Sequence, residues 1–134
     1  MKKYIIDNLG NQTITGNLTL DGDMEVQGSM KSNLVFNSTG GTYLLQLSDN
    51  GKVVELSSSS TTSILIPMES SVPFPDGSQI LLVRGGTGDV IVEGATGTVL
   101  LSAEGNTSLN YQYSAATLLK KENDTWYLFG DLKA

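Results

Sequence analysis

The stretch TITGNLTLDGDMEVQGSM, residues 13–30, decides how the N-terminal part of this chain folds, because glycine returns in it every sixth residue. The glycines on this period are Gly10, Gly16, Gly22 and Gly28. Between them apolar and polar side chains alternate, as in Leu18-Thr19-Leu20, which is typical of a strand with one buried face. Glycine also permits the positive φ or the close backbone approach that a sharp corner requires. The spacing therefore predicts short strands that turn at each glycine.

The hexad segment is too short to bury its own apolar stripe. A β-helix formed by a single chain needs about three hexads per coil and several stacked coils before its interior closes. We therefore predict that residues 10–42 form a short β-helix-like stalk in which three chains intertwine around a common axis. The predicted trimer interface consists of Leu18, Leu20, Met24 and Val26. The alternative is a monomeric sandwich in which these segments are ordinary antiparallel strands joined by glycine turns.

From Tyr43 to the C-terminus, short apolar segments are separated by turn sequences. Asn50-Gly51, between YLLQL and VVEL, is typical of a hairpin, and a turn at Asn123-Asp124 joins ATLLKKE to TWYLFGD. Helical spacing of apolar residues does not persist anywhere, so no helix of consequence is expected. Strands at intervals of about ten residues predict that residues 43–134 form a β-sandwich or jelly-roll-like domain, which makes the chain all-β.

The composition excludes several classes of function. The 134 residues include 14 acidic and 8 basic side chains, giving a net charge of −6, and the basic residues form no stripe, so we expect no binding to nucleic acid. Cysteine and histidine are both absent, which removes thiolate and imidazole metal ligands and the usual nucleophile–base pairs. We therefore expect no enzymatic activity and no cofactor. Because no apolar run approaches the ~18 residues of a membrane helix, we expect no membrane partner.

Two further motifs have a structural and a chemical interpretation. Asp21, Asp23 and Glu25 alternate and share the outward face of the predicted stalk, where three copies could collect oxygen ligands for Ca²⁺. A solvated acidic face is the more common meaning of such a run, and no metal site is predicted. The cluster Gly85–Gly88 lacks the lysine and the following helix of a phosphate-binding loop, so we interpret it as a connection between strands.

Aromatic side chains gather near the C-terminus. In the last predicted strand Trp126 points to one face, and Tyr127 and Phe129 point to the other. In the preceding predicted strand, SLNYQY, Tyr111 and Tyr113 share a face. One interpretation is core packing on the first face and an inter-subunit contact on the second. The alternative is a carbohydrate-binding platform of exposed aromatic rings.

The β part of the chain resembles a domain found in structural proteins of tailed bacteriophages, at the ends of tail fibres and in small head or decoration proteins. The runs that carry this resemblance are DNGKVVELSSSSTTSILIP (49–67), VPFPDGSQILLVRGGTGDVIVEGATGTVLLS (72–102) and YQYSAATLLKKENDTWYLFGDL (111–132). The hexads of GNLTLDGDMEV (16–26) are similar to the trimeric β-helical shafts of phage fibres. Together the two resemblances imply a homotrimeric virion protein without enzymatic activity.

Two positions in the virion fit these expectations. The first is a capsid decoration or cement protein on the outer surface of the head, with the major capsid protein of the shell as its partner. The second is a tail fibre or spike tip that binds a host receptor, such as a glycan. A fibre needs an attachment region, and only residues 1–9 precede the repeat, which favours decoration. We predict that residues 1–9 form a capsid-binding arm, with an apolar cluster of Tyr4, Ile5, Ile6 and Leu9.

Overall fold

A computed structural model of the chain describes residues 13–134, which divide between two compact units, Met1–Ser32 and Asn33–Ala134. In the first unit the backbone bends at Gly16, at residues 21–22 and at residues 27–28, with no regular secondary structure in between. Gly16 and Gly22 have φ values of +105° and +120°, so the positive φ predicted for these corners is confirmed. Residues 13–35 contain no strand, and the hexad stalk therefore stays a prediction.

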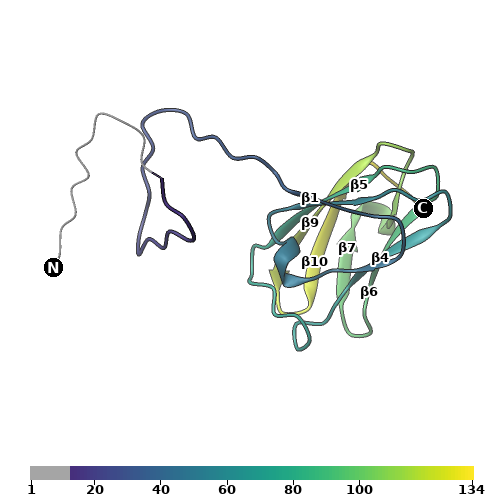
Figure 1. The fold of residues 1–134 in the computed structure, drawn as a ribbon. Helices are drawn as coiled ribbons and strands as arrows, with labels where there is room; N and C mark the ends of the chain where they lie inside the picture. The colour runs from purple at the N-terminus through teal and green to yellow at the C-terminus, as the bar shows by residue number, and fades with distance from the viewer. Residues whose placement is uncertain (1–12) are drawn as a thin grey trace. The chain divides into compact units, whose positions relative to one another are not determined.

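The second unit is built of two mixed β-sheets (Figure 1). Sheet A contains, in spatial order, β1 (Phe36–Thr39), β3 (Val53–Leu56), β5 (Gln79–Arg84), β9 (Ala115–Glu122), β10 (Thr125–Gly130) and β7 (Val99–Ser102). Sheet B contains β11 (Leu132–Lys133), β8 (Ser108–Leu109), β6 (Val90–Gly94), β4 (Thr62–Ile66) and β2 (Tyr43–Leu44). Two short 3₁₀ turns, η1 (Leu47–Asp49) and η2 (Ala103–Gly105), are the helical elements of the described residues. The strand-rich fold agrees with the expected all-β class. Strand β1 lies within residues 10–42, the range assigned to the stalk, but it belongs to sheet A.

From β1 to β6 the chain alternates between the two sheets, so that strands in each sheet run parallel. Sheet A pairs β1 with β3 and β3 with β5, and sheet B pairs β2 with β4 and β4 with β6, all in parallel. The jelly-roll-like topology is not confirmed, because jelly rolls are built from antiparallel strands. The hairpin predicted at Asn50-Gly51 is wrong. The strands on either side of this turn, β2 and β3, lie in different sheets, so the turn connects the two sheets.

The C-terminal half closes the sheets with antiparallel strands. β9 pairs with β5 on one side and with β10 on the other. The predicted turn between β9 and β10 is confirmed, and Asn123 occupies it with a φ of +49°. The strand predicted over SLNYQY ends at Leu109, and Tyr111 and Tyr113 lie instead in the connection from β8 to β9. Tyr113 has a φ of +72°, which a ladder position does not permit.

Both sheets contribute side chains to one hydrophobic core. The Phe74 ring meets Trp126 edge-on, with centroids 5.3 Å apart and an interplanar angle of 84°. In β10 the predicted alternation is confirmed, because Trp126 and Leu128 are buried whereas Tyr127 and Phe129 are exposed. The buried members of the core are Leu45, Val54, Leu56, Ile64, Ile66, Phe74, Ile80, Leu82, Val90, Val92, Leu109, Ala116, Leu118, Trp126 and Leu128.

Candidate interaction surfaces

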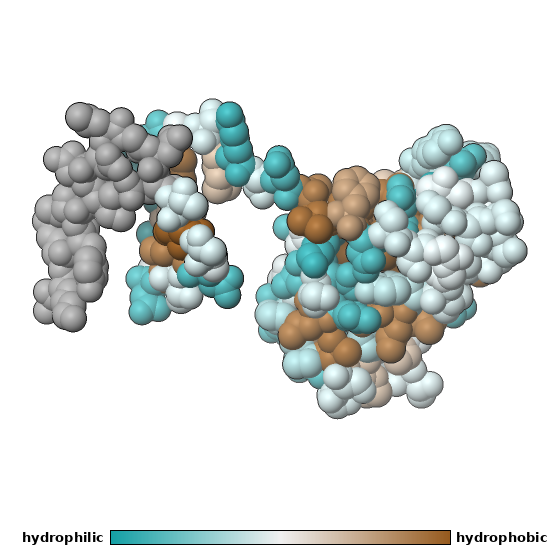
Figure 2. All heavy atoms as spheres, in the orientation of Figure 1, coloured by the Kyte–Doolittle hydropathy of each residue, from teal (hydrophilic) through white to brown (hydrophobic). Residues whose placement is uncertain are grey.

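The four residues predicted to form a trimer interface are solvent-exposed in the single chain. Leu18, Leu20, Met24 and Val26 are each between 47% and 59% exposed. Figure 2 shows hydrophobic side chains on the surface of this segment beside the hydrophilic ones. We call these four residues the hexad stripe. The predicted arm residues Tyr4, Ile5, Ile6 and Leu9 lie outside the described residues.

A second exposed apolar surface covers the outer side of sheet A. The strand registers align Phe36, Val53, Leu81, Thr117 and Phe129 in one row across five strands, and in this row Val53 is only 1% exposed. They align Gln79, Leu119, Tyr127 and Leu101 in a neighbouring row. Residues aligned in this way point to the same side of a sheet. We call this surface the A face, and it matches the inter-subunit contact interpreted from Tyr127 and Phe129.

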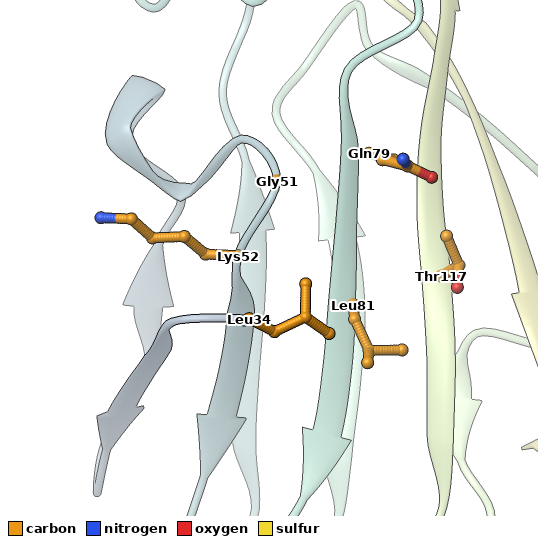
Figure 3. Close-up of a pocket in the computed structure, with 6 residues that line it drawn as sticks. All are labelled: Leu34, Gly51, Lys52, Gln79, Leu81 and Thr117. Carbon is orange, nitrogen blue, oxygen red and sulfur yellow. The ribbon is translucent and has the colours of Figure 1, made fainter. Parts of the chain in front are cut away.

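Two shallow hollows lie on the A face. The first, of about 240 Å³, is lined by Leu34, Lys52, Gln79, Leu81 and Thr117 together with Gly51. Figure 3 shows the Leu34 side chain directed toward the strand that carries Leu81, while Lys52 extends in the opposite direction. The second, of about 290 Å³, is lined by residues of β7 and β10 and includes Leu101, Tyr127 and Phe129. Such hollows accept side chains of a partner and are too open for the enclosure of a small substrate.

The outer side of sheet B is different. Among the strands of sheet B in the described residues, the one large apolar side chain that is classed as exposed is Leu44, at 52%. The corresponding apolar residues of β4 and β6, Leu65 and Ile91, are half-buried. The exposed apolar surface of the β unit is therefore concentrated on the A face.

The connection from β8 to β9 exposes two aromatic rings on a well-fixed turn. Tyr111 and Tyr113 are 71% and 77% exposed. The turn backbone is fixed because Tyr113 N donates to Arg84 O at 2.7 Å and Tyr111 N donates to Ser114 Oγ at 2.9 Å. A positive φ at a bulky residue is strained, so surrounding contacts have to maintain it. The turn thus holds both rings in a defined place at the surface.

Asp131, the residue that follows β10, stabilises the turn that carries Tyr111 and Tyr113. Its carboxylate accepts hydrogen bonds from Ser114 Oγ at 2.6 Å and from Asn110 Nδ2 at 3.0 Å. The Ser114 bond, followed by the Asn110 bond, lowers the pKa of Asp131 below its ordinary value of 3.8. The carboxylate therefore remains ionised and keeps these donors in place at neutral pH.

The glycine cluster after β5 is a structural connection, as the sequence indicated. The buried Arg84 guanidinium donates to the carbonyl oxygen of Thr87 at 2.6 Å, to Asp89 Oδ1 at 2.9 Å and to carbonyl oxygens at the end of β8. A Cβ at Gly86 or Gly88 would overlap the backbone of Ser58 or Ser60. The carbonyl groups of this loop are therefore directed to a cation of the chain itself. Sequence reasoning missed the role of Arg84, although a lone arginine ending an apolar strand was a signal.

A polar cluster fixes η1 at the edge of the β unit. The Tyr43 hydroxyl donates to Asp49 Oδ2 at 2.7 Å and accepts from Asn37 Nδ2 at 2.8 Å. The Asp49 side chain is buried and also accepts from the backbone N–H of Gln46. Desolvation, followed by the interaction with Asp49, raises the pKa of Tyr43 to about 12. The phenol therefore stays neutral, and its contacts with β1 and η1 serve structure.

The described residues also bear on metal binding and on membrane-spanning helices. Between residues 13 and 134, no three carboxylate side chains gather closely enough to hold a metal ion. Asp21, Asp23 and Glu25 are each exposed. The same part of the chain has no helix with the length and apolar character needed to span a bilayer. What the geometry offers is a set of exposed surfaces.

Comparison of the whole chain with protein-family models, with curated proteins and with solved structures finds no match.

Proposed function

We propose that this chain is a non-enzymatic structural protein of a phage virion, and that it assembles as a homotrimer which decorates and stabilises the head shell. The observation that carries the proposal is the exposure of the hexad stripe. Four large apolar side chains, each about half exposed and spaced around bends at Gly16 and Gly22, form a surface that one chain leaves open to water. Burying such side chains between copies contributes about 25 cal/mol per Å² of apolar surface.

The bends explain why other copies of the same chain suit this stripe. In the part of the chain that the structure describes, the pieces between these glycines pair with no other strand. Three copies wound together would let each piece pair with a neighbouring copy and direct its apolar side chains to a shared axis. The resemblance of the hexads to phage fibre shafts supports the same arrangement.

Decoration of the head follows from the resemblance of the β part to head decoration proteins and from the predicted arm. The partner would be the major capsid protein, contacted by Tyr4, Ile5, Ile6 and Leu9. A protein that binds only the assembled shell stabilises it by mass action, by about 2.7 kcal/mol when its concentration is 100 times the dissociation constant.

Sedimentation and head binding test this proposal in sequence. Purified chain at micromolar concentration should sediment with the mass of a trimer, and a monomer at all concentrations would contradict it. The trimer should bind phage heads that lack the protein and raise the temperature at which they release DNA. A chain lacking residues 2–9 should stay trimeric but leave the heads bare. Heads that are equally heat-resistant with and without the protein would contradict the cement function.

A fibre or spike tip that binds a host glycan is the second candidate, and the Tyr111–Tyr113 turn favours it. Aromatic rings held rigidly at the surface stack on sugar rings. Localisation of labelled protein at fibre ends, combined with saccharide binding that is lost in Tyr111→Ala and Tyr113→Ala, would support this candidate. Labelling over the head would contradict it.

A further inference from the structure

The outer side of sheet A is the second exposed apolar surface of the molecule, and the hexad stripe does not include it. Its large side chains are between 39% and 60% exposed; they are Leu34, Phe36, Val99, Leu101, Tyr127 and Phe129. They come from β1, β7 and β10 and from the residues just before β1, which lie far apart in sequence. The fold therefore assembles this surface.

We propose that the A face packs against other copies of this chain, so that the β units take part in the trimer together with the hexad stripe. This inference rests on the homotrimer proposed above and assigns a second part of its interface. The two surfaces are carried by different residues, so that experiments can separate them.

The size of the A face is that of an interface. Six large apolar side chains that are each about half exposed offer on the order of 500 Å² of apolar surface. A standard interface takes about 800 Å² from each partner, of which the apolar part is roughly 60%. Side chains of a partner can enter the two hollows, which allows close packing.

The charge pattern favours a second copy as the occupant. The chain carries a net charge of −6, so that a contact through acidic surface would add repulsion between two copies, whereas a contact through uncharged surface does not. The two aligned rows of the A face provide that surface. From Phe36 to Phe129 in one row and from Gln79 to Leu101 in the other, they contain no acidic or basic residue. Three charged residues lie on the same side of the sheet outside these rows. Glu55 accepts a hydrogen bond from Ser38 Oγ, Lys52 lines the first hollow, and Lys121 follows Leu119 by two positions in β9.

Chain continuity gives the second argument. The backbone runs from Val26 of the hexad stripe to Leu34, which lines the first hollow of the A face, within one short stretch of sequence. Once three chains are joined through the stripe, their A faces are present at millimolar effective concentration. A contact that is weak between separate β units then becomes occupied in the trimer.

Tyrosine nitration of the full-length chain tests the inference and contains its own controls. We expect Tyr127 to react at least ~10-fold more slowly in the trimer than in chain diluted until it sediments as a monomer. Tyr111 and Tyr113, which lie in the β8–β9 connection, should react equally fast in both samples. Peptide mass spectrometry identifies each modified residue. Equal reactivity of Tyr127 in trimer and monomer would overturn the inference.

A matched pair of substitutions provides the second measurement. Phe129 on the A face and Leu44 on sheet B are both 52% exposed. Phe129→Asp should raise the trimer dissociation constant about 100-fold, because it places like charges between copies, whereas Leu44→Asp should change it less than about threefold. Circular dichroism of the buried Trp126 verifies that both variants remain folded.

The outcomes distinguish this inference from the proposal on which it rests. A wild-type chain that is monomeric at every concentration would overturn both. A trimer in which Phe129→Asp has no effect and Tyr127 stays reactive would overturn the A-face contact and leave the hexad stripe as the interface. If Tyr127 is protected only in intact virions, the A face contacts the head shell and not other copies of the chain, and this result would also overturn the inference.

Discussion

Lys120 Nζ lies 3.1 Å from Glu69 Oε1, although the lysine side chain is 1% exposed and the glutamate side chain is 41% exposed. The same ammonium group donates to the carbonyl oxygen of Phe74. Through these two contacts, β9 holds the connection between β4 and β5. Phe74 in that connection packs on Trp126, so that the Lys120 ammonium holds in place a residue of the hydrophobic core.

Removing Lys120 should therefore destabilise the β unit far more than removing its partner. We expect Lys120→Ala to lower the free energy of unfolding by about 3 kcal/mol, because it leaves a cavity and an unpaired carbonyl. Glu69→Ala should lower the free energy of unfolding by about 1 kcal/mol, because the Lys120 ammonium keeps its hydrogen bond to Phe74 and the lost carboxylate is half exposed. Urea denaturation followed by Trp126 fluorescence measures both. Lys121→Ala, at the exposed next residue, is the control and should stay within about 0.5 kcal/mol.

Acid should weaken the contacts of Asp89. Asp89 Oδ1 lies 2.9 Å from both Lys133 Nζ and Arg84 Nη1, and the Lys133 bond, followed by the Arg84 interaction, lowers the pKa of Asp89 from 3.8. A lowered pKa in the folded state gives stability that is present above pH 3.8 and is lost as the pH falls through the folded value. Urea titrations between neutral pH and acid should show a shallower decline for Asp89→Asn than for the wild type. An unchanged decline would contradict this role.

Alkali should act through Tyr43. Its pKa is raised from 10.0 to about 12, so the folded state retains a proton that the unfolded state has already lost. The stability contribution is present below pH 10 and disappears as the pH rises toward 12. Ultraviolet titration should show a tyrosine ionisation step near pH 12, and Tyr43→Phe should remove that step. A titration that is unchanged in Tyr43→Phe would contradict the buried contact with Asp49.

The turn after Arg84 should tolerate no side chain at Gly88. A Cβ there would overlap the backbone of Ser60, which the connection from β3 to β4 cannot easily move. We expect Gly88→Ala to lower the free energy of unfolding by about 2 kcal/mol, by analogy with other overpacked sites. Gly41→Ala, where a Cβ would meet nothing within 4 Å, is the control and should have little effect. Equal stability of the two variants would contradict the close packing of this turn.

Among the glycines of the six-residue period, Gly16 and Gly22 should matter for assembly and Gly28 should not. Gly16 and Gly22 have positive φ values, whereas Gly28 does not, and all three have open space around the Cβ position. Gly16→Val and Gly22→Val should each destabilise the hexad segment by more than about 1 kcal/mol and weaken the proposed trimer, because a valine is strained at a positive φ. Gly28→Val is the matched control and should assemble normally. Sedimentation of the three variants measures their assembly. If all three assemble equally well, the positive φ at Gly16 and Gly22 is not needed for the trimer.

Local patterns in the sequence predicted many strands well. The segment QILLVR corresponds to β5, because its alternating apolar residues meet the core on one side. The segment YLLQL yields only the two residues of β2, because Asp49 caps η1 and draws Tyr43 toward it. A buried aspartate with a nearby tyrosine is a tertiary contact, which a strand pattern does not contain.

The pairing of strands and the A face could not be predicted from the sequence. Asn50-Gly51 favours a hairpin locally, but the fold places Val53 beside Leu81, and that parallel register depends on residues far along the chain. The alternation of Tyr127 and Phe129 with buried residues predicted their outward direction, whereas an inter-subunit contact through them stays a prediction. Their alignment with Leu101 and Phe36 required the strand order. Arg84 was missed because its partners are mostly backbone carbonyl groups.

The alternation of β1 to β6 between two sheets also determines how fast the chain can fold. Every parallel pair joins residues that are distant in sequence, such as Phe36 with Val53 and Thr62 with Val90, so each pairing has to close a long loop before it gains any contact. The β9–β10 hairpin is the local exception. Topologies dominated by distant pairings fold in milliseconds to seconds. During that interval the apolar strands are exposed to other nascent chains, and the β9–β10 hairpin is synthesised after strands β1 to β8.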